Sequence, residues 1–370
     1  MDDGAPAAAD GPIRFAVVYG VTGPYAGTAQ DFLTGFNAGV DDINSHGGVN
    51  GRQIQVNVLD DKSDPAYAVS LLTDLLDSAD APDVIVPGGV SSEVLAMLPL
   101  TTDRQLFSVS PATSPKVNVP ADYPQHFGVS ATQAAGLTIL ADDFRARSIK
   151  TLAVVLPADA FGDSVLAGIK AAADQAGVKI VGTERPDPNA LNFMVEYQRV
   201  QGTKPDAVFA DFASQDAIAR LFAARQTVGA TDIPLYGGAS AAASVPSKLA
   251  QAEAIANCQL PVFSFTVAGD EAPANLKPLI AAFSGSERGI YAGGLGWDSV
   301  HLAALAFKDA GEGSPAEALL SNGVPKETLA LFPAGTAFTK DNHFPELTPG
   351  SMVLVPCTSG MADGRWSVTK

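Results

Sequence analysis

One segment near the N-terminus, residues 13–64, constrains the fold more than any other part of the chain. It opens with a continuous apolar run at 13–19, which is typical of a strand buried on both faces of a parallel sheet. A Gly- and Pro-rich loop at 20–27 follows, and apolar residues then recur at helical spacing over 31–43. After a Gly-Gly pair, residues 54–58 alternate between apolar and polar side chains. The segment therefore predicts a strand–loop–helix–turn–strand unit.

The same alternation continues along the chain and predicts an α/β protein whose parallel sheets are covered on both faces. Apolar runs predict further strands at 84–86, 106–109, 152–156, 178–181, 207–212 and 234–236. Helical spacing predicts helices at 92–102, 132–147, 163–175, 192–200, 215–227, 274–283 and 294–309. The units fall into two successive series, and the length of 370 residues also favours two domains.

Composition and motifs argue against several classes of function. The formal net charge of −17 argues against nucleic acid or an anionic membrane surface as a partner. No apolar run reaches the ~20 residues that cross a bilayer. The sequence contains no nucleophile-elbow, Walker or dinucleotide-binding motif, and its four histidines are scattered without ligand spacing. We therefore expect no enzyme activity, no metal and no cofactor.

Short motifs spread in order along nearly the whole chain resemble those of one family. They lie at residues 15–23, 41–44, 47–52, 60–65, 110–115, 161–162, 205–208 and 294–298. The ordered set is similar to type I periplasmic solute-binding proteins, most of all to the Leu/Ile/Val receptor group of ABC importers. The resemblance implies an exported, periplasmic or extracytoplasmic receptor that delivers a solute to an ABC permease in the membrane. We expect a monomer, and no signal peptide within this chain.

The resemblance also implies two Rossmann-like lobes joined by a three-segment hinge that closes around a solute. The predicted boundaries give a disordered leader at 1–11, a first lobe at 12–128 and 264–336, and a second lobe at 129–263 and 337–370.

Two cysteines, Cys258 and Cys357, lie beside predicted strands. From the residues alone, they are either two buried apolar thiols or a disulfide. The resemblance places both cysteines in the second lobe, and an exported compartment would favour their pairing. We therefore predict a Cys258–Cys357 disulfide.

Ser91 and Ser92 follow a Gly-rich turn at the end of a predicted strand, where they begin a helix. Free N–H groups and the helix dipole attract anions at such a position, although helix capping alone would also explain a serine there. In the resembling receptors, the serine matching Ser91 holds the ligand carboxylate, and the threonine matching Thr113 holds both carboxylate and amine. Ala112 precedes Thr113 in a loop one residue shorter than the family pattern, and we include it in the site.

The predicted amine side of the site departs from the family pattern. Amino-acid receptors of this group use acidic residues to neutralise the ligand ammonium, but the matching positions here hold Thr132 and Ala239. Burying an unpaired ammonium would cost several kcal/mol, so these residues count against a plain α-amino acid. Asp159 and Asp211 lie on nearby loops and could replace the missing acids, although capping or solvated aspartates are commoner.

Aromatic residues are expected to line the rest of the cleft. Phe161, Phe212 and Tyr25 are candidates for its walls, whereas Tyr19 is expected to pack in the core of its strand. A carboxylate anchor with aromatic walls predicts an aryl or branched aliphatic carboxylate as the solute. The alternatives are a branched-chain or other amino acid, or an amide- or urea-type sensor module of the same fold.

Overall fold

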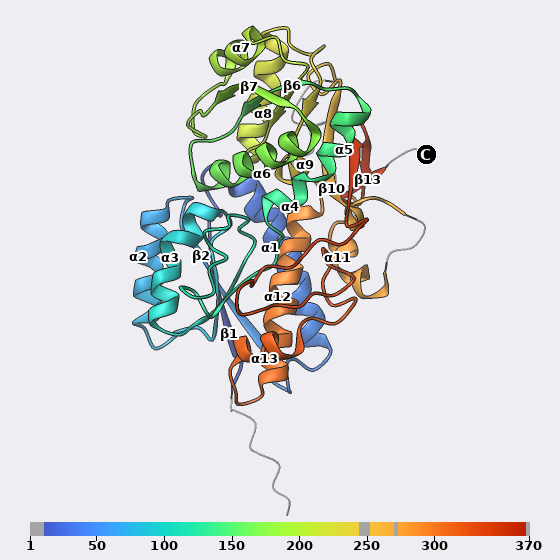
Figure 1. Ribbon diagram of the computed structural model, residues 1–370. Coiled ribbons are helices and arrows are strands. Elements are labelled where there is room, and N and C mark those ends of the chain that lie inside the picture. The colour runs from blue at the N-terminus through green and yellow to red at the C-terminus, as the bar shows by residue number, and fades with distance from the viewer. Residues whose placement is uncertain (1–10, 244–251, 270–272, 287, 368–370) are drawn as a thin grey trace, which may run out of the picture.

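The computed structural model describes residues 11–243, 252–269, 273–286 and 288–367, which form two α/β lobes stacked end to end (Figure 1). The predicted fold class is confirmed. The sheet of lobe 1 is parallel with the order β2-β1-β3-β4-β5. Its strands are β1 (Ile13–Tyr19), β2 (Ile54–Asp60), β3 (Val84–Pro87), β4 (Phe107–Ser110) and β5 (His126–Gly128). The leader predicted at 1–11 lies, except for Gly11, outside the described residues.

Helices cover both faces of this sheet because side chains alternate along β1. Phe15 and Val17 point into one cluster, and Ala16 and Val18 point into another on the opposite face. The helices of lobe 1 are α1 (Ala26–Ser45), α2 (Pro65–Leu76), α3 (Ser91–Asp103), α11 (Lys277–Ala282), α12 (Tyr291–Ala310) and α13 (Pro315–Asn322), with 3-10 turns η1 (Ser264–Thr266) and η2 (Ala274–Leu276). Within the described ranges, no helix is both long and apolar enough to cross a membrane.

Lobe 2 contains a sheet of order β11-β10-β9-β8-β6-β7. Its strands are β6 (Thr151–Val155), β7 (Lys179–Glu184), β8 (Ala207–Ala210), β9 (Leu235–Tyr236), β10 (Cys258–Phe263) and β11 (Met352–Pro356). The sheet is parallel except at one edge, where β11 runs antiparallel to β10. The chain leaves lobe 2 at Phe263 and returns beside it at Met352, so β11 must run back along β10.

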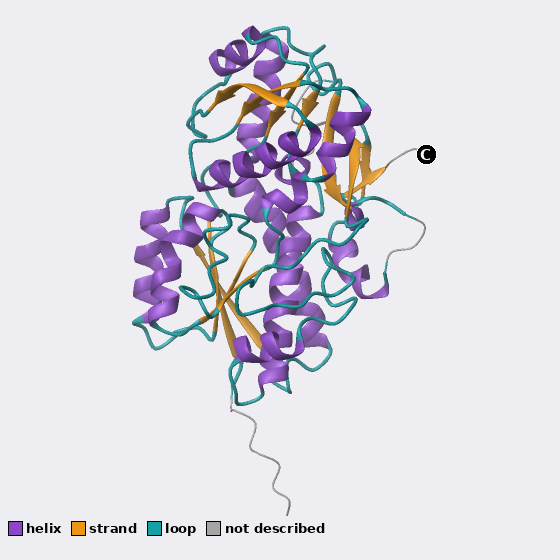
Figure 2. Cartoon of the chain, in the orientation of Figure 1, coloured by secondary structure: helices purple, strands orange, loops and turns teal. Residues whose placement is uncertain are grey.

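The helices of lobe 2 surround this sheet (Figure 2). They are α4 (Gln133–Leu137), α5 (Ile139–Ala146), α6 (Ala160–Ala176), α7 (Met194–Gly202), α8 (Gln215–Thr227) and α9 (Ala239–Ala243). One helix predicted at 132–147 is two, α4 and α5, which meet at Thr138. The Thr138 hydroxyl donates to the Ala135 carbonyl at 2.7 Å, a local bond of the kind that competes with helical hydrogen bonding. A short hairpin, β12 (Gly360–Ala362) and β13 (Arg365–Ser367), follows β11.

The chain crosses between the lobes three times, but the third crossing lies later than the boundary predicted at 336/337. Phe338 packs edge-on against Phe127, with their ring centroids 5.1 Å apart, and Phe344 is buried beside Val94 in lobe 1. These aromatic side chains are buried only if residues 338–344 stay on lobe 1. The crossing therefore falls between Phe344 and Met352.

Cys258 and Cys357 form a disulfide in lobe 2, with their Cα atoms 5.2 Å apart. The bond joins the paired strands β10 and β11 at the ends away from the cleft.

Candidate solute-binding site

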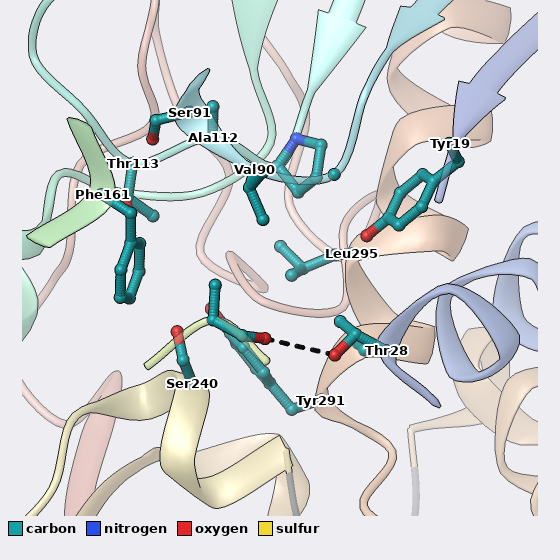
Figure 3. A pocket seen from close by; sticks show the side chains of 14 residues that line it. Tyr19, Thr28, Val90, Ser91, Ala112, Thr113, Phe161, Ser240, Tyr291 and Leu295 are labelled. Atoms are coloured by element: carbon teal, nitrogen blue, oxygen red, sulfur yellow. Dashed lines mark hydrogen bonds between the residues drawn. The ribbon is translucent and has the colours of Figure 1, made fainter. Parts of the chain in front are cut away.

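A cavity of about 50 Å³ lies between the two lobes (Figure 3). Lobe 1 contributes most of its wall, and lobe 2 closes it from the other side. The lining residues are Tyr19, Thr28, Gly89, Val90, Ser91, Pro111, Ala112, Thr113, Tyr291, Ala292 and Leu295 from lobe 1, with Phe161, Ala213 and Ser240 from lobe 2.

The sheet of lobe 1 explains why the cavity forms there. β1 lies between β2 and β3 in the sheet. The chain therefore goes from β1 to β2 on one side and then crosses back to β3 on the other side of β1. Parallel α/β sheets leave a crevice at the carboxyl ends of strands beside such a switch point. Tyr19 ends β1, residues 89–91 follow β3, and residues 111–113 follow β4, so all three strand ends face the cavity.

Two predicted residues, Ser91 and Thr113, bring hydroxyl groups to the cavity. Ser91 Oγ accepts a hydrogen bond from the Ser114 N–H at 3.3 Å, which leaves the Ser91 hydroxyl proton available. Thr113 Oγ1 is buried and has no hydrogen-bond partner among the residues that the structure describes. From lobe 2, Ser164 Oγ donates to the Thr113 carbonyl at 3.1 Å, so this loop also contacts the opposite lobe.

Part of the helix start that was expected to bind an anion is already occupied. Glu93 Oε2 accepts hydrogen bonds from the N–H groups of Gly89 and Val90, at 3.0 and 3.4 Å. Burial, together with the charge of Asp61, raises the pKa of Glu93 to about 8. The donors available at this turn are therefore the Ser91 hydroxyl and the N–H groups beyond Val90.

Asp211 and Asp159 are local capping groups in the structure. Asp211 is fully buried, and its Oδ1 accepts from the Ala241 N–H at 3.0 Å, which holds the start of α9. Burial raises the pKa of Asp211 to about 8, although backbone N–H groups act in the opposite direction. Asp159 Oδ1 accepts from the Gly162 N–H at 2.8 Å and caps α6, which carries Phe161 into the cavity. Neither aspartate belongs to the cavity wall.

The other predicted site residues also lie outside the wall of this cavity. Phe212 stacks on Phe193 in the core of lobe 2, with their ring centroids 4.9 Å apart. Tyr25 precedes α1, and burial with the charge of Asp159 raises its pKa. Ser92, Thr132 and Ala239 each sit next to a helix start without lining the cavity. Of the predicted set, the structure brings together Ser91, Ala112, Thr113 and Phe161.

Sequence reasoning missed several cavity residues. Tyr19 was expected only in the core, and it is indeed 2% exposed, but its ring also lines the cavity. A Cβ at Gly89 would lie 2.1 Å from that ring, so this position requires glycine. The glycine was the sequence feature that could have indicated a side chain packed against this turn. Tyr291 and Leu295 are spaced by one helical turn on α12, a pattern that an ordinary core helix shares.

Hydrogen bonds between the N-terminal ends of α1 and α8, including the residues just before each helix, close the cavity at one side. Three of them cross from lobe to lobe: Thr28 Oγ1 to the Ala213 carbonyl at 3.3 Å, Ser214 Oγ to the Pro24 carbonyl at 2.7 Å, and Gln215 Nε2 to Asp31 Oδ2 at 3.0 Å. Asp31 is fully buried and also pairs with Arg288 at 2.8 Å. Burial raises the pKa of Asp31 to about 6, against the opposing effects of Arg288 and Gln215.

The part of the cavity wall that the structure describes is mainly apolar and carries no charged side chain. Its polar side chains are hydroxyls, and none of its lining residues is Lys, Arg, His, Asp or Glu. Within the described ranges, no group of three or more His, Cys, Asp or Glu side chains could hold a metal ion. The site is thus suited to binding a small solute through hydrogen bonds and apolar contacts.

Comparison with known proteins agrees with this geometry. The family model described as periplasmic binding protein matches residues 12–355. The chain belongs to this family. Among the relatives of this periplasmic binding protein is the leucine-, isoleucine-, valine-, threonine- and alanine-binding protein of Pseudomonas aeruginosa, 27% identical over 174 residues. The match covers 45% of this chain and 45% of the relative, so it spans about half the length of that curated protein.

Solved structures share the fold over almost the whole chain. The LivJ substrate-binding protein of Streptococcus pneumoniae, in complex with isoleucine, has a TM-score of 0.78 at 20% identity, covering 96% of this chain and 98% of that one. A solute-binding protein of an ABC transporter from Rhodopseudomonas palustris, in complex with 3,4-dihydroxybenzoic acid, has a TM-score of 0.76 at 21% identity, covering 92% and 95%.

Proposed function

We propose that this periplasmic binding protein captures a small carboxylate, aromatic or branched aliphatic, and delivers it to an ABC permease. The observation that carries the proposal is the pair of hydroxyls at the switch point of lobe 1. Thr113 Oγ1 is buried and has no partner within the described chain segments, and the Ser91 hydroxyl keeps its proton for an acceptor. An unpaired buried hydroxyl is costly, so a ligand oxygen at this place would satisfy it.

The remainder of the wall supports an apolar body on the solute. Tyr19, Phe161, Tyr291 and Leu295 surround the space beyond the two hydroxyls (Figure 3). Apolar contact with such side chains contributes roughly 25 cal/mol for each Å² removed from water, before the cost of ordering the solute. We further propose that the receptor is exported and works as a monomer outside the cytoplasm.

An α-amino acid is the second candidate. The isoleucine complex of the pneumococcal protein supports it, as do the acidic groups behind the wall, above all the buried Asp211 beneath α9. An ammonium would be attracted by these groups where they are ionised. The polar side chains that the described residues offer it at the wall itself are nevertheless hydroxyls.

Calorimetry with matched solutes tests the proposal. We expect isocaproate and phenylpropionate to bind more tightly than leucine and phenylalanine, which differ from them by the amino group. Thr113→Val should weaken binding of the acids about tenfold or more, because it removes a hydrogen bond to a charged group while keeping the side-chain shape. Ser92→Ala, which changes a neighbouring residue outside the wall, is the control. Tighter binding of the amino acids, weakened in Asp211→Asn, would instead establish the second candidate.

A further inference from the structure

Among the described residues, lobe 2 presents a single polar side chain to the cavity. Its lining residues are Phe161, Ala213 and Ser240, of which only Ser240 carries a hydroxyl. Within the described part of the chain, Ser240 Oγ has no hydrogen-bond partner. Ser240 comes from α9 and stands across the cavity from Ser91 and Thr113 of lobe 1 (Figure 3). A solute held by the two lobe 1 hydroxyls would therefore meet Ser240 on its other side.

Asp211 fixes the position of Ser240 but is itself shielded from the cavity. The Asp211 carboxylate accepts from the Ala241 N–H, the residue directly after Ser240. A Cβ at Gly238 would lie 1.9 Å from Asp211 Oδ2, so the carboxylate packs directly against this glycine, and Asp211 is fully buried. The group that reaches the cavity from this corner is consequently the neutral Ser240 hydroxyl, with the buried Asp211 carboxyl behind it.

We propose that Ser240 hydrogen-bonds a second, uncharged polar group of the solute, so that the preferred carboxylates are α-hydroxy or α-keto acids. The inference rests on the proposed function, which places the carboxylate at Ser91 and Thr113. A serine hydroxyl can donate to a keto oxygen or accept from a hydroxyl, and it cannot neutralise an ammonium. Because the cavity is small, the second polar group must lie close to the carboxylate.

Three matched probes test the inference by calorimetry on the full chain: isocaproate, its α-hydroxy derivative leucate, and leucine. Leucate should bind about three- to tenfold more tightly than isocaproate, the range for one neutral hydrogen bond, and leucine should bind weakest. Ser240→Ala should abolish the preference for leucate while leaving isocaproate affinity unchanged. Ser92→Ala, the matched control outside the wall, should keep the preference.

The outcomes separate this inference from the proposed function. Equal affinities for leucate and isocaproate, or a preference that survives Ser240→Ala, would overturn the inference and leave the carboxylate receptor standing. Tightest binding of leucine would overturn the inference in favour of an amino-acid receptor. If none of the three probes binds, both the inference and the proposed solute class fail. The order of affinities in the unmodified protein tests the inference even if Ser240→Ala does not fold.

Discussion

At the scale of single residues, the sequence indicated two hydroxyls that line the cavity, Ser91 and Thr113, and it left two roles open for Asp159 and Asp211. Ser91 and Thr113 follow strand ends, where local pattern and the position of ligand sites coincide. Asp211 and Asp159 also follow strands, but their backbone partners, Ala241 and Gly162, become neighbours only through the tertiary fold or a helix cap. A carboxylate that caps a helix and one that faces a ligand look alike in sequence.

Asp298 gives a prediction about pH at this scale. It is fully buried on α12, and its oxygens accept from the N–H groups of Ala330 and Leu331 at 2.6 and 3.0 Å. Burial nevertheless raises the pKa of Asp298 to about 8. The folded-state pKa therefore lies above the unfolded value of 3.8, so the stabilisation from its protonated form is lost as pH rises toward about 8.

The midpoint temperature of thermal unfolding should therefore decrease as the pH is raised from about 6.5 to about 8. This window lies above the range in which His126 titrates, because burial lowers its pKa from 6.5 to about 3. Asp298→Asn should be less stable overall, since its amide cannot accept both N–H groups, and its midpoint should depend less on pH. An unchanged slope in Asp298→Asn would reject the assigned role.

At the scale of elements, the strands and long helices follow from periodicity, whereas contacts between distant elements do not. α1 and α12 are separated by some 245 residues in sequence, yet their backbones touch. A Cβ at Gly35 would lie 1.9 Å from the Gly293 carbonyl oxygen, and one at Gly296 would lie 2.1 Å from that of Phe32. Three glycines in helical segments thus mark a helix–helix contact, which sequence alone did not reveal.

Gly35→Ala should destabilise the protein by several kcal/mol, because the added methyl group forces α1 and α12 apart in a packed core. The matched control is Gly202→Ala in α7, where a Cβ would meet nothing within 4 Å. Alanine has the higher helix propensity, so the control should be neutral or slightly more stable. Denaturant unfolding of the two variants measures the difference, and equal stabilities would contradict the close contact.

At the scale of the whole molecule, the two lobes and their crossings follow from the order of the motifs. The exact position of the third crossing does not follow from this order. It depends on Phe338 and Phe344 being buried in lobe 1, and the local sequence does not indicate which lobe buries them. The lobes also meet through contacts between residues far apart in sequence, such as the hydrogen bond from Gln215 to the buried Asp31.

Gln215→Ala should weaken solute binding about tenfold through faster release, although Gln215 does not line the cavity. The lost bond helps only the closed arrangement, so the association rate should change little. Gln226→Ala, at the other end of α8, is the matched control. Stopped-flow measurements with isocaproate separate the two rates, and an unchanged release rate would remove Gln215 from the closure contacts.

The central claim is that this periplasmic binding protein closes its lobes around a small carboxylate. Spin labels at Tyr67→Cys and Leu191→Cys, exposed positions on lobe 1 and lobe 2, report the distance across the cleft. The native cysteines form a disulfide, so only the introduced thiols should react. We predict that isocaproate or leucate shifts the distances toward shorter values, and less so in Thr113→Val. Distances that stay unchanged with every acid tested would contradict the account.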